Sequence, residues 1–174
     1  MRIIGGEFRS RKLRSVPGLE VRPTPDRLRE TLFNVLAPRI AGTVFVDAYA
    51  GSGAVGLEAL SRGAKRVILI EKKQAAIEVI RDNIATLKIG KEAASVVRGQ
   101  AGLLLANFPA DMVFIDPPYE LEDEYTASLN ALAATPCELA IAQHAGRLTL
   151  AEEYGRLHKT RVLKQGDNAL SFYS

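Results

Sequence analysis

The sequence predicts an α/β fold with a mostly parallel sheet that is covered by helices on both faces. Continuous apolar runs alternate with amphipathic stretches, which is typical of strands buried on both faces. Three of the runs end in a carboxylate, at Asp47, Glu71 and Asp116, and ligands of such sheets bind beyond the carboxyl ends of the strands. The 174 residues, 47% apolar and 25% charged, fit one globular domain.

The N-terminal region begins with a basic segment. Residues 2–13 alternate around Gly5-Gly6 and predict a short β-hairpin. A proline-rich stretch then interrupts regular structure, and Thr24 suits the N-cap of a helix with Pro25 at its first position. Apolar residues recur at helical spacing over 28–36. We therefore predict a basic arm at residues 1–22 and the core of a single domain at residues 23–174.

The core alternates between strands and helices. Strands are predicted at 43–46, 67–70, 95–97, 112–115 and 139–142, with helices at 55–62, 74–87, 103–106 and 124–133. Gly63 and Gly90 follow the first two of these helices, where glycine favours a helix end. The tail predicts two further strands, at about 161–163 and 169–172, as a hairpin.

Positive charge is concentrated in the first thirty residues. They contain eight Arg and Lys against four Asp and Glu, a net charge of +4, which leaves −1 for the remainder. Such a basic segment suits the phosphate contacts that supply most sequence-independent affinity for nucleic acid. A solvated basic tail is the alternative. The cations expected to contact phosphates are Arg9, Arg11, Lys12 and Arg14.

Several classes of protein are disfavoured. The single cysteine, Cys137, permits no internal disulfide, and we expect it to be a buried apolar residue. No Cys/His cluster could hold zinc, so no metal is expected. No apolar run reaches the roughly 18 residues of a membrane span, and the N-terminus lacks the apolar region of a secretory signal. We expect a cytosolic (cytoplasmic) protein.

A glycine turn follows the first core strand, where Gly51, Gly53 and Gly56 match G-x-G-x-x-G. Glycines permit a tight bend and close approach of a ligand to the backbone. With Glu71 further along, the pattern also fits a dinucleotide-binding dehydrogenase. However, four residues separate the strand from Gly51, and Asp47 would repel a pyrophosphate. A carboxylate at the mouth of the site suits the cationic sulfonium and ammonium of S-adenosylmethionine instead. A glycine turn without a ligand is the third interpretation.

Two polar residues after later strands complete the predicted cofactor site. Glu71 is acceptor-only and would accept hydrogen bonds from both ribose hydroxyls; the alternative is an ion pair with Lys72 or Lys73. Gln100 follows the third strand, where its amide oxygen could accept from the adenine amine. The predicted cofactor-binding residues are Asp47, Ala50, Gly51, Ser52, Gly53, Glu71 and Gln100.

The segment Asp116-Pro117-Pro118-Tyr119 indicates the chemistry. Proline has no N–H and a fixed φ, so the carbonyl before each proline is held rigidly. A rigid carbonyl and the Asp116 carboxylate are two fixed acceptors for an exocyclic –NH2, whose lone pair they would aim at the transferred methyl. Tyr119 would stack on the target base. The alternative is a Pro-Pro turn with Asp116 as an N-cap. The predicted catalytic residues are Asp116, Pro117 and Tyr119.

These motifs together resemble the RsmD-type 16S rRNA (guanine-966-N2) methyltransferases of bacteria. The blocks that carry the resemblance are Arg2-Ile3-Ile4-Gly5-Gly6, Arg11-Lys12-Leu13, Arg22-Pro23-Thr24, residues 26–34 and 50–64, Ile70-Glu71 and Asp116-Pro117-Pro118-Tyr119. The resemblance implies a class I S-adenosylmethionine-dependent methyltransferase fold, Rossmann-like, with a seven-stranded, mostly parallel sheet. It also implies one guanine target in 16S rRNA, presented by an assembled or partly assembled 30S subunit.

One departure from this family lies at the end of the fifth core strand. Many relatives carry a carboxylate there, whereas this chain has Gln143-His144, which puts an acid role in doubt. We expect His144 to be exposed, with contact to the RNA as the alternative. Two other functions stay open. The same acceptor pair would serve an adenine-N6 or cytosine-N4 DNA methyltransferase, although sequence-specific DNA methylation needs extra recognition structure. A non-catalytic RNA-binding module is the other, which the intact Asp116 and Tyr119 argue against.

Overall fold

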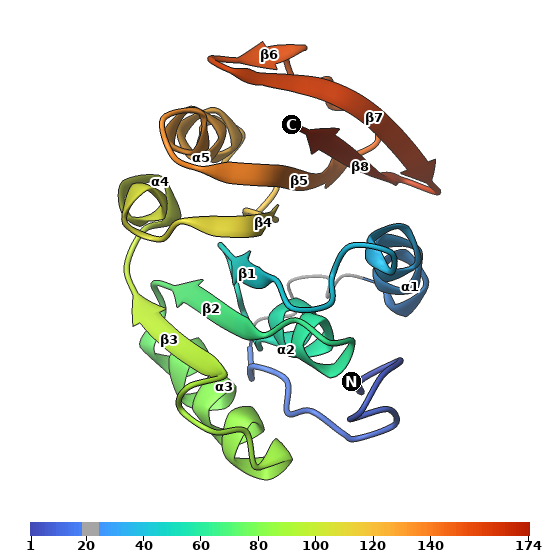
Figure 1. The fold of residues 1–174 in the computed structure, drawn as a ribbon, viewed down its shortest axis with the longest axis vertical. Coiled ribbons are helices and arrows are strands. Elements are labelled where there is room, and N and C mark those ends of the chain that lie inside the picture. The colour runs from blue at the N-terminus through green and yellow to red at the C-terminus, as the bar shows by residue number, and fades with distance from the viewer. Residues whose placement is uncertain (19–24) are drawn as a thin grey trace.

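Each apolar run predicted to be a strand lies in one central sheet of the computed structural model, which describes residues 1–18 and 25–174 (Figure 1). The strands are β1 (Val44–Asp47), β2 (Arg66–Glu71), β3 (Ala94–Arg98), β4 (Ala110–Ile115), β5 (Cys137–Ala145), β6 (Glu153–Tyr154), β7 (Leu157–Gln165) and β8 (Asn168–Tyr173). The helices are α1 (Asp26–Leu36), α2 (Ala54–Ser61), α3 (Gln74–Leu87), α4 (Ala101–Leu104), the 3-10 turn η1 (Leu105–Asn107) and α5 (Asp123–Ala133).

The strand order is β3-β2-β1-β4-β5-β8-β7-β6. Strands β1 to β5 pair in parallel, whereas β8 pairs antiparallel with both β5 and β7. The predicted tail hairpin is β7–β8. An eighth strand, the two-residue β6, extends the expected seven because it pairs with the start of β7; two residues are too few to show alternation in the sequence.

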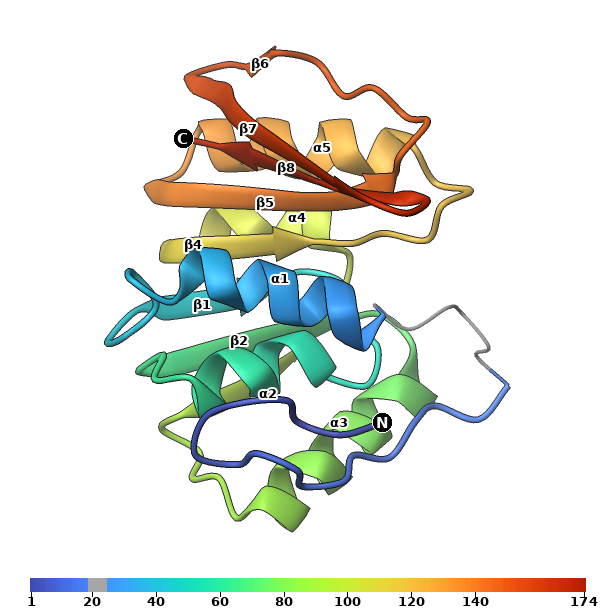
Figure 2. The same cartoon turned by 90° about the vertical axis from the view of Figure 1, so that its right-hand side faces the viewer.

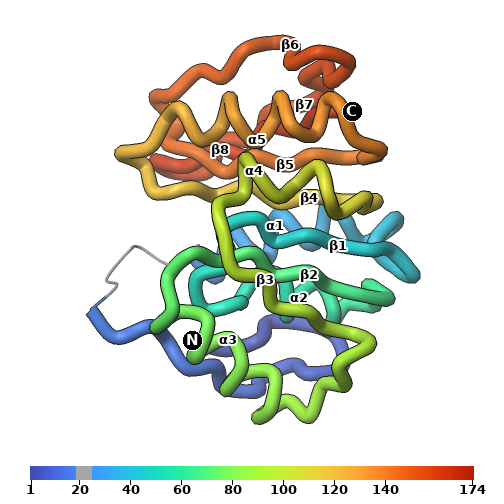
Figure 3. Tube along the Cα trace, turned by 90° about the vertical axis from the view of Figure 1, so that its left-hand side faces the viewer, coloured from blue at the N-terminus to red at the C-terminus, as the bar shows by residue number. Residues whose placement is uncertain are grey.

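Helices cover both faces of the sheet. Apolar residues of α1 and α2 pack with Phe45, Leu69 and Phe114 on one face, as Figure 2 shows with α1 and α2 in front of the strands. Residues of α4 and α5 pack with Val46 and Val113 on the other face, the side seen in Figure 3. Successive strand residues therefore point to opposite faces of the sheet. Because both faces are buried in an apolar core, the strands are continuous apolar runs in the sequence.

The strand order reverses at β1. From β1 the chain proceeds outward through β2 and β3, and then returns to β4 on the other side of β1. In parallel register, Asp47 pairs with Leu69 on β2 and Phe114 on β4. The predicted ligand site therefore lies where the chain leaves β1 and β4, because ligands of open α/β sheets bind at such a reversal.

The N-terminal segment has less strand character than the predicted hairpin. Its antiparallel pairing is a single bridge between Arg2 and Lys12, flanked by an Ile3 N–H bond to the Arg11 carbonyl at 3.0 Å. A longer ladder does not form because a side chain of α2, Glu58, accepts the next two backbone N–H groups, those of Ile4 and Gly5. The segment lies across α2 and α3 in Figure 2, with its apolar residues against both helices.

The start of α1 differs by one residue from the prediction. The helix begins at Asp26 with Pro25 as its N-cap residue, whereas Pro25 was expected at the first helical position. The expected N-cap, Thr24, and residues 19–22 of the arm lie outside the described residues.

Candidate active site at the carboxyl edge of the sheet

The glycine turn between β1 and α2 is closed by its own backbone. The Ala50 N–H donates to the Ile70 carbonyl at 3.0 Å, and the Gly53 N–H donates to the Ala50 carbonyl at 2.7 Å. Gly51 and Gly53 have φ angles of +55° and +82°, a left-handed region that favours glycine. No atom lies within 4 Å of the point where a Gly51 side chain would begin. The turn therefore presents an open backbone surface at Gly51.

Asp47 lies beneath this turn. It is 2% exposed, and its Oδ2 accepts the Gly56 N–H at 2.9 Å. Burial, with the charge of Glu71 as a smaller contribution, raises the pKa of Asp47 to about 7, although the Gly56 N–H acts in the opposite direction. The prediction that the Asp47 carboxylate lies at the mouth of the site is therefore wrong. Its side chain is buried and accepts a hydrogen bond from the first turn of α2.

Gly56 permits the close contact between α2 and the sheet. A Cβ there would lie 2.8 Å from Leu69 Cδ2 and 3.3 Å from Asp47 Cβ, so that a larger residue must displace a buried neighbour. The third glycine of the motif thus has a packing role rather than a conformational one.

Glu71 is fixed at the end of β2 by backbone donors. Its Oε2 accepts the Gly51 N–H at 2.9 Å, and its Oε1 accepts the N–H groups of Lys72 and Lys73 at 2.8 and 2.9 Å. The lysines thus contact this carboxylate through their backbone, where the alternative interpretation expected an ion pair. A carboxylate has about four acceptor positions, so these three bonds leave capacity for a further donor.

Gln100 lies close to Glu71 in the fold. The Gly99 N–H donates to the Glu71 carbonyl at 3.1 Å, and Gln100 is the N-cap residue of α4. Its side chain is exposed at the end of β3. The structure therefore brings Gln100, Glu71 and the glycine turn to neighbouring strand ends.

The segment Asp116-Pro117-Pro118-Tyr119 leaves the sheet directly after β4. The Pro118 carbonyl accepts the Leu121 N–H at 2.9 Å, and the Tyr119 hydroxyl donates to Asn168 Oδ1 at 2.7 Å. Asn168 is 4% exposed at the start of β8, so the tyrosine ring is anchored from a distant strand. Asp116 and Tyr119 are half-buried.

A buried tyrosine of α5 lies beside this segment. Burial raises the pKa of Tyr125, and the charge of Asp116 raises it further. Its hydroxyl donates to the Gln143 carbonyl at 2.8 Å. Tyr125 therefore joins α5 to the end of β5, within the electrostatic influence of Asp116.

The residues at the end of β5 are not exposed. Gln143 and His144 are each 2% exposed. His144 Nε2 lies 2.8 Å from Ser171 Oγ, and burial lowers its pKa. The expectation of an exposed His144 is wrong, because β8 and α5 cover this strand end. Among residues 1–18 and 25–174, Gln143 Oε1 has no hydrogen-bond partner.

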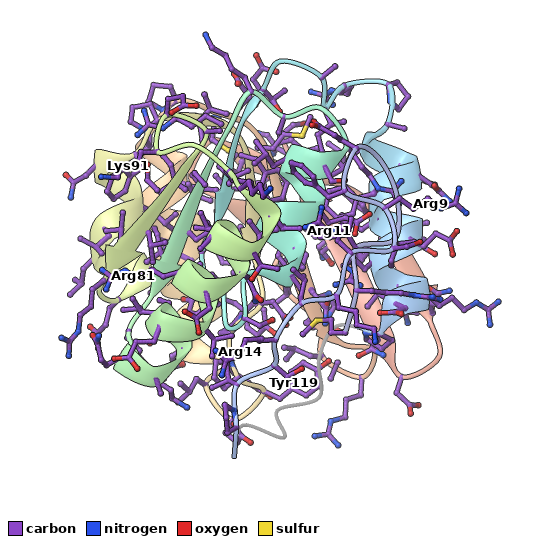
Figure 4. The ribbon with its side chains drawn as sticks, turned by 90° about the horizontal axis from the view of Figure 1, so that it is seen from below. Arg9, Arg11, Arg14, Arg81, Lys91 and Tyr119 are labelled. Carbon is purple, nitrogen blue, oxygen red and sulfur yellow. The ribbon has the colours of Figure 1, made fainter. Side chains whose placement is uncertain are left out.

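The four cations predicted to contact phosphates lie on the exposed side of the arm. Arg9, Arg11, Lys12 and Arg14 are all exposed. Two of them also contact α3: Arg11 Nη2 donates to the Thr86 carbonyl at 2.9 Å, and Arg14 forms an ion pair with Asp82. Figure 4 shows Arg9, Arg11 and Arg14 along this segment on the face that also carries Arg81 and Lys91. The arm is thus a docked basic surface.

Residues that the sequence did not single out hold the arm in place. Glu58 of α2 is fully buried, accepts the N–H groups of Ile4 and Gly5 at 2.8 and 2.9 Å, and pairs with Arg62 Nε at 2.7 Å. Arg29 of α1 is also fully buried and donates to the Arg2 carbonyl at 2.6 Å. A buried carboxylate and a buried guanidinium therefore fix the start of the arm to the core.

Metal-binding clusters and membrane-spanning helices are both absent from the described residues. Across 1–18 and 25–174, no group of three or more His, Cys, Asp or Glu side chains is arranged to hold a metal ion. In the same part of the chain, no helix is long and apolar enough to cross a membrane. A hollow at the opposite, amino edge of the sheet is lined by Asp111, Cys137 and Arg156 among others, away from the edge where ligands of such sheets bind.

The fold and this site are those of a class I methyltransferase. The strand order of the parallel sheet reverses at β1, the glycine turn follows β1, Glu71 ends β2, and Asp-Pro-Pro-Tyr follows β4. The solved structure described as "Putative methyltransferase yhhF from Escherichia coli" has a TM-score of 0.84 and 40% identity, covering 99% of this chain and 96% of that one.

Comparison of sequences identifies the family. The model described as "Conserved hypothetical protein 95" matches residues 1–174. "Ribosomal RNA small subunit methyltransferase D" of Escherichia coli K12 is 50% identical over 121 residues, which are 68% of this chain and 60% of that protein. "Putative rRNA methyltransferase YlbH" of Bacillus subtilis is 33% identical over 99% of this chain and 98% of its own length. The chain belongs to the RsmD family.

Proposed function

We propose that this protein transfers a methyl group from S-adenosylmethionine to the exocyclic N2 amine of a guanine in 16S rRNA. The observation that carries the proposal is the placement of Asp116-Pro117-Pro118-Tyr119 at the end of β4, beside the strand whose end bears the glycine turn. The names of the relatives support the same class of reaction on ribosomal RNA.

The chemistry of the glycine turn and the neighbouring strand ends fits the cofactor. Glu71, with acceptor capacity left, would bind a ribose hydroxyl, and the open backbone at Gly51 would lie against the cofactor. Ala50, Ser52 and Gly53 complete the turn, and Gln100 would accept from the adenine amine. The negative charge of Asp47, beneath the turn, would favour binding of the cationic sulfonium and ammonium of the cofactor. When bound, the cofactor supplies an electrophilic methyl on a cationic sulfur.

The residues after β4 would position the base. Asp116 and the rigid carbonyl between Asp116 and Pro117 would accept hydrogen bonds from the –NH2 group and direct its lone pair to the methyl. As the amine nitrogen bonds the methyl carbon and the sulfur–carbon bond breaks, the amine proton would pass to Asp116 or to water. Tyr119, whose hydroxyl is held by Asn168, would stack on the base.

The substrate would be bound through its phosphates. Arg9, Arg11, Lys12 and Arg14 form an exposed cationic surface on the docked arm, and phosphate contacts supply affinity without reading sequence. Because such contacts do not read sequence, we propose that an assembled or partly assembled 30S subunit, in the cytosol, presents the guanine.

Nucleoside mass spectrometry of 16S rRNA tests the proposal. Undermethylated 30S subunits are incubated with S-adenosylmethionine and the wild-type protein, and N2-methylguanosine should appear only when the protein is present. The Asp116→Ala variant should bind cofactor with nearly unchanged affinity and lose turnover about 10²-fold or more. Turnover that survives this substitution would remove Asp116 from its assigned role.

A parallel incubation separates the alternatives. Supercoiled DNA with tritiated S-adenosylmethionine is compared with 30S subunits under the same conditions. Label on DNA in preference to the subunit would favour an adenine-N6 or cytosine-N4 DNA methyltransferase. RNA binding without label on either substrate would favour a non-catalytic module.

A further inference from the structure

One buried side chain joins the basic arm to the glycine turn. Asn83 of α3 is 1% exposed. Its Oδ1 accepts the Arg14 N–H at 2.8 Å, and its Nδ2 donates to the Arg14 carbonyl at 3.1 Å and to the Ser52 carbonyl at 2.9 Å. An asparagine amide has two donor hydrogens, so Asn83 uses both of them. A fully bonded buried amide holds its partners in one arrangement.

The two partners of Asn83 belong to the two proposed binding surfaces. Ser52 lies between Gly51 and Gly53, in the part of the turn proposed to hold the cofactor. Arg14 carries an exposed guanidinium, which Asp82, the neighbour of Asn83 in α3, holds in an ion pair. Any displacement of the Arg14 backbone on RNA binding must therefore change the hydrogen bonds of the residue that holds the turn.

Other contacts join the arm to the beginning of α2. Ile3 and Leu13 pack in one buried cluster with Ala54 and Leu57, which lie in the first half of α2. Ser52 Oγ also lies 3.8 Å from Met1 Sδ. The arm therefore covers the segment that leads out of the turn.

The opposite end of the arm is anchored independently of the turn. Ser61, at the end of α2, accepts the Phe8 N–H through its Oγ at 2.9 Å and donates to the Gly5 carbonyl at 2.6 Å. Neither bond reaches a residue of the glycine turn. Ser61 thus provides a matched control for Asn83, because its loss loosens the arm and leaves the Ser52 carbonyl in place.

We infer that Asn83 is a positioning residue that couples RNA binding on the arm to cofactor binding at the glycine turn. The inference rests on the proposed function, since it needs RNA on the arm and cofactor on the turn. Asn83 holds both partners in one arrangement, so an arrangement of Arg14 that RNA favours also fixes the Ser52 carbonyl for the cofactor. By linkage, each ligand should then raise the affinity for the other by the same factor.

The test measures the binding of S-adenosylhomocysteine to the full-length protein, alone and with saturating undermethylated 30S subunits. For the wild type, we expect the subunit to lower the dissociation constant about fivefold or more. The Asn83→Ala and Asn83→Asp variants should each reduce this factor to near 1. Asn83→Asp keeps the acceptor for the Arg14 N–H and replaces both donors by an oxygen.

Two controls separate coupling from loosening of the arm. Ser61→Ala should weaken subunit binding while it preserves the coupling factor, and Asp82→Asn should preserve it because the backbone bonds of Arg14 remain. A wild-type factor of 1, or full coupling in either Asn83 variant that circular dichroism shows to be folded, would overturn the inference. A different result would contradict the proposed function itself: a wild-type protein that neither binds nor methylates the subunit.

Discussion

Asp47 Oδ2 lies 2.9 Å from the Gly56 nitrogen, so the carboxylate at the end of β1 accepts a hydrogen bond from the first turn of α2 inside the core. The pKa of this buried group is raised to about 7, with burial as the largest cause and Glu71 as a further one. The native state therefore binds a proton on Asp47 more tightly than the unfolded chain, in which aspartate has a pKa of about 3.9.

The first prediction concerns the stability of the cofactor-free protein as a function of pH. A raised native pKa stabilises the fold below about pH 4, and this contribution is lost as the pH rises from about 4 to 7. Each unit of pKa shift corresponds to about 1.4 kcal/mol. Asp47→Asn, which keeps an acceptor for Gly56 and has no proton to lose, should show a weaker decline between pH 5 and 7.5 in urea unfolding. Parallel curves for the two proteins would contradict the assignment.

The second prediction compares two glycines of the same motif. Gly56→Ala places a methyl group 2.8 Å from Leu69 Cδ2, which is buried, and overpacking costs about 1–3 kcal/mol, more than the roughly 1 kcal/mol of helix propensity gained. Gly51→Ala meets no atom within 4 Å but adopts a φ of +55°, which costs about 1–2 kcal/mol. Urea unfolding should therefore show both variants to be less stable.

Cofactor binding should separate these two variants. The added methyl of Gly51→Ala projects into the open space over the turn, so the dissociation constant of S-adenosylhomocysteine should rise about tenfold or more, equivalent to about 1.4 kcal/mol. Gly56→Ala, which changes the buried side of the turn, should change this constant less at a temperature where both proteins are folded. The reverse order would place the cofactor elsewhere.

The third prediction uses the bond between Tyr119 and Asn168. Tyr119→Phe keeps the ring and loses the 2.7 Å hydrogen bond, so turnover on 30S subunits should fall only a few-fold. Tyr119→Ala removes the stacking surface, and stacking of a base on an aromatic ring contributes about 1–3 kcal/mol, so kcat/KM should fall about 10- to 100-fold. Both variants should bind S-adenosylhomocysteine as the wild type does. Equal losses in the two variants would indicate that the hydroxyl, and not the ring, matters.

The sequence predicted the placement of the carboxylates because strand ends are encoded locally. Asp47, Glu71 and Asp116 each terminate or follow an apolar run, and the structure has them at one edge of the sheet. The direction of each side chain was not encoded locally. Asp47 turns inward because the Gly56 N–H, nine residues later, lies beneath the turn. His144 is buried because β8 supplies Ser171, and the position of β8 beside β5 depends on the whole sheet.

The anchoring of the arm was partly visible in the sequence. Ile80, Asn83 and Leu87 share one face of α3 at spacings of three and four, and all three are buried. An amide on an otherwise apolar helix face indicates a buried hydrogen-bonding side chain, and the sequence contains this pattern. The hydrogen-bond partners of Asn83 could not be predicted from the sequence, since Arg14 lies 69 residues away and Ser52 lies 31 residues away. The same holds for Glu58, whose carboxylate ends the strand pairing predicted for residues 2–13.

The fourth prediction concerns the arm as a phosphate-binding surface. Arg9→Ala and Lys12→Ala leave the Arg11 bond to Thr86 and the Arg14 ion pair with Asp82 in place, so these substitutions remove charge without loosening the arm from α3. The dissociation constant for 30S subunits should rise at low salt. The slope of log K against log salt should fall by about 0.7–0.9 for each phosphate that the variant no longer neutralises.

A charge-matched pair on the other side of the molecule is the control for this measurement. Arg161 and Lys164 are exposed on β7, at the opposite end of the sheet from the arm (Figure 1). Their double alanine variant changes the net charge by the same amount, so a general electrostatic effect would act on both pairs alike. If phosphates bind to the arm, only the Arg9 and Lys12 pair should flatten the salt dependence. Equal slopes for the two variants would show that the arm contributes net charge without binding phosphates directly.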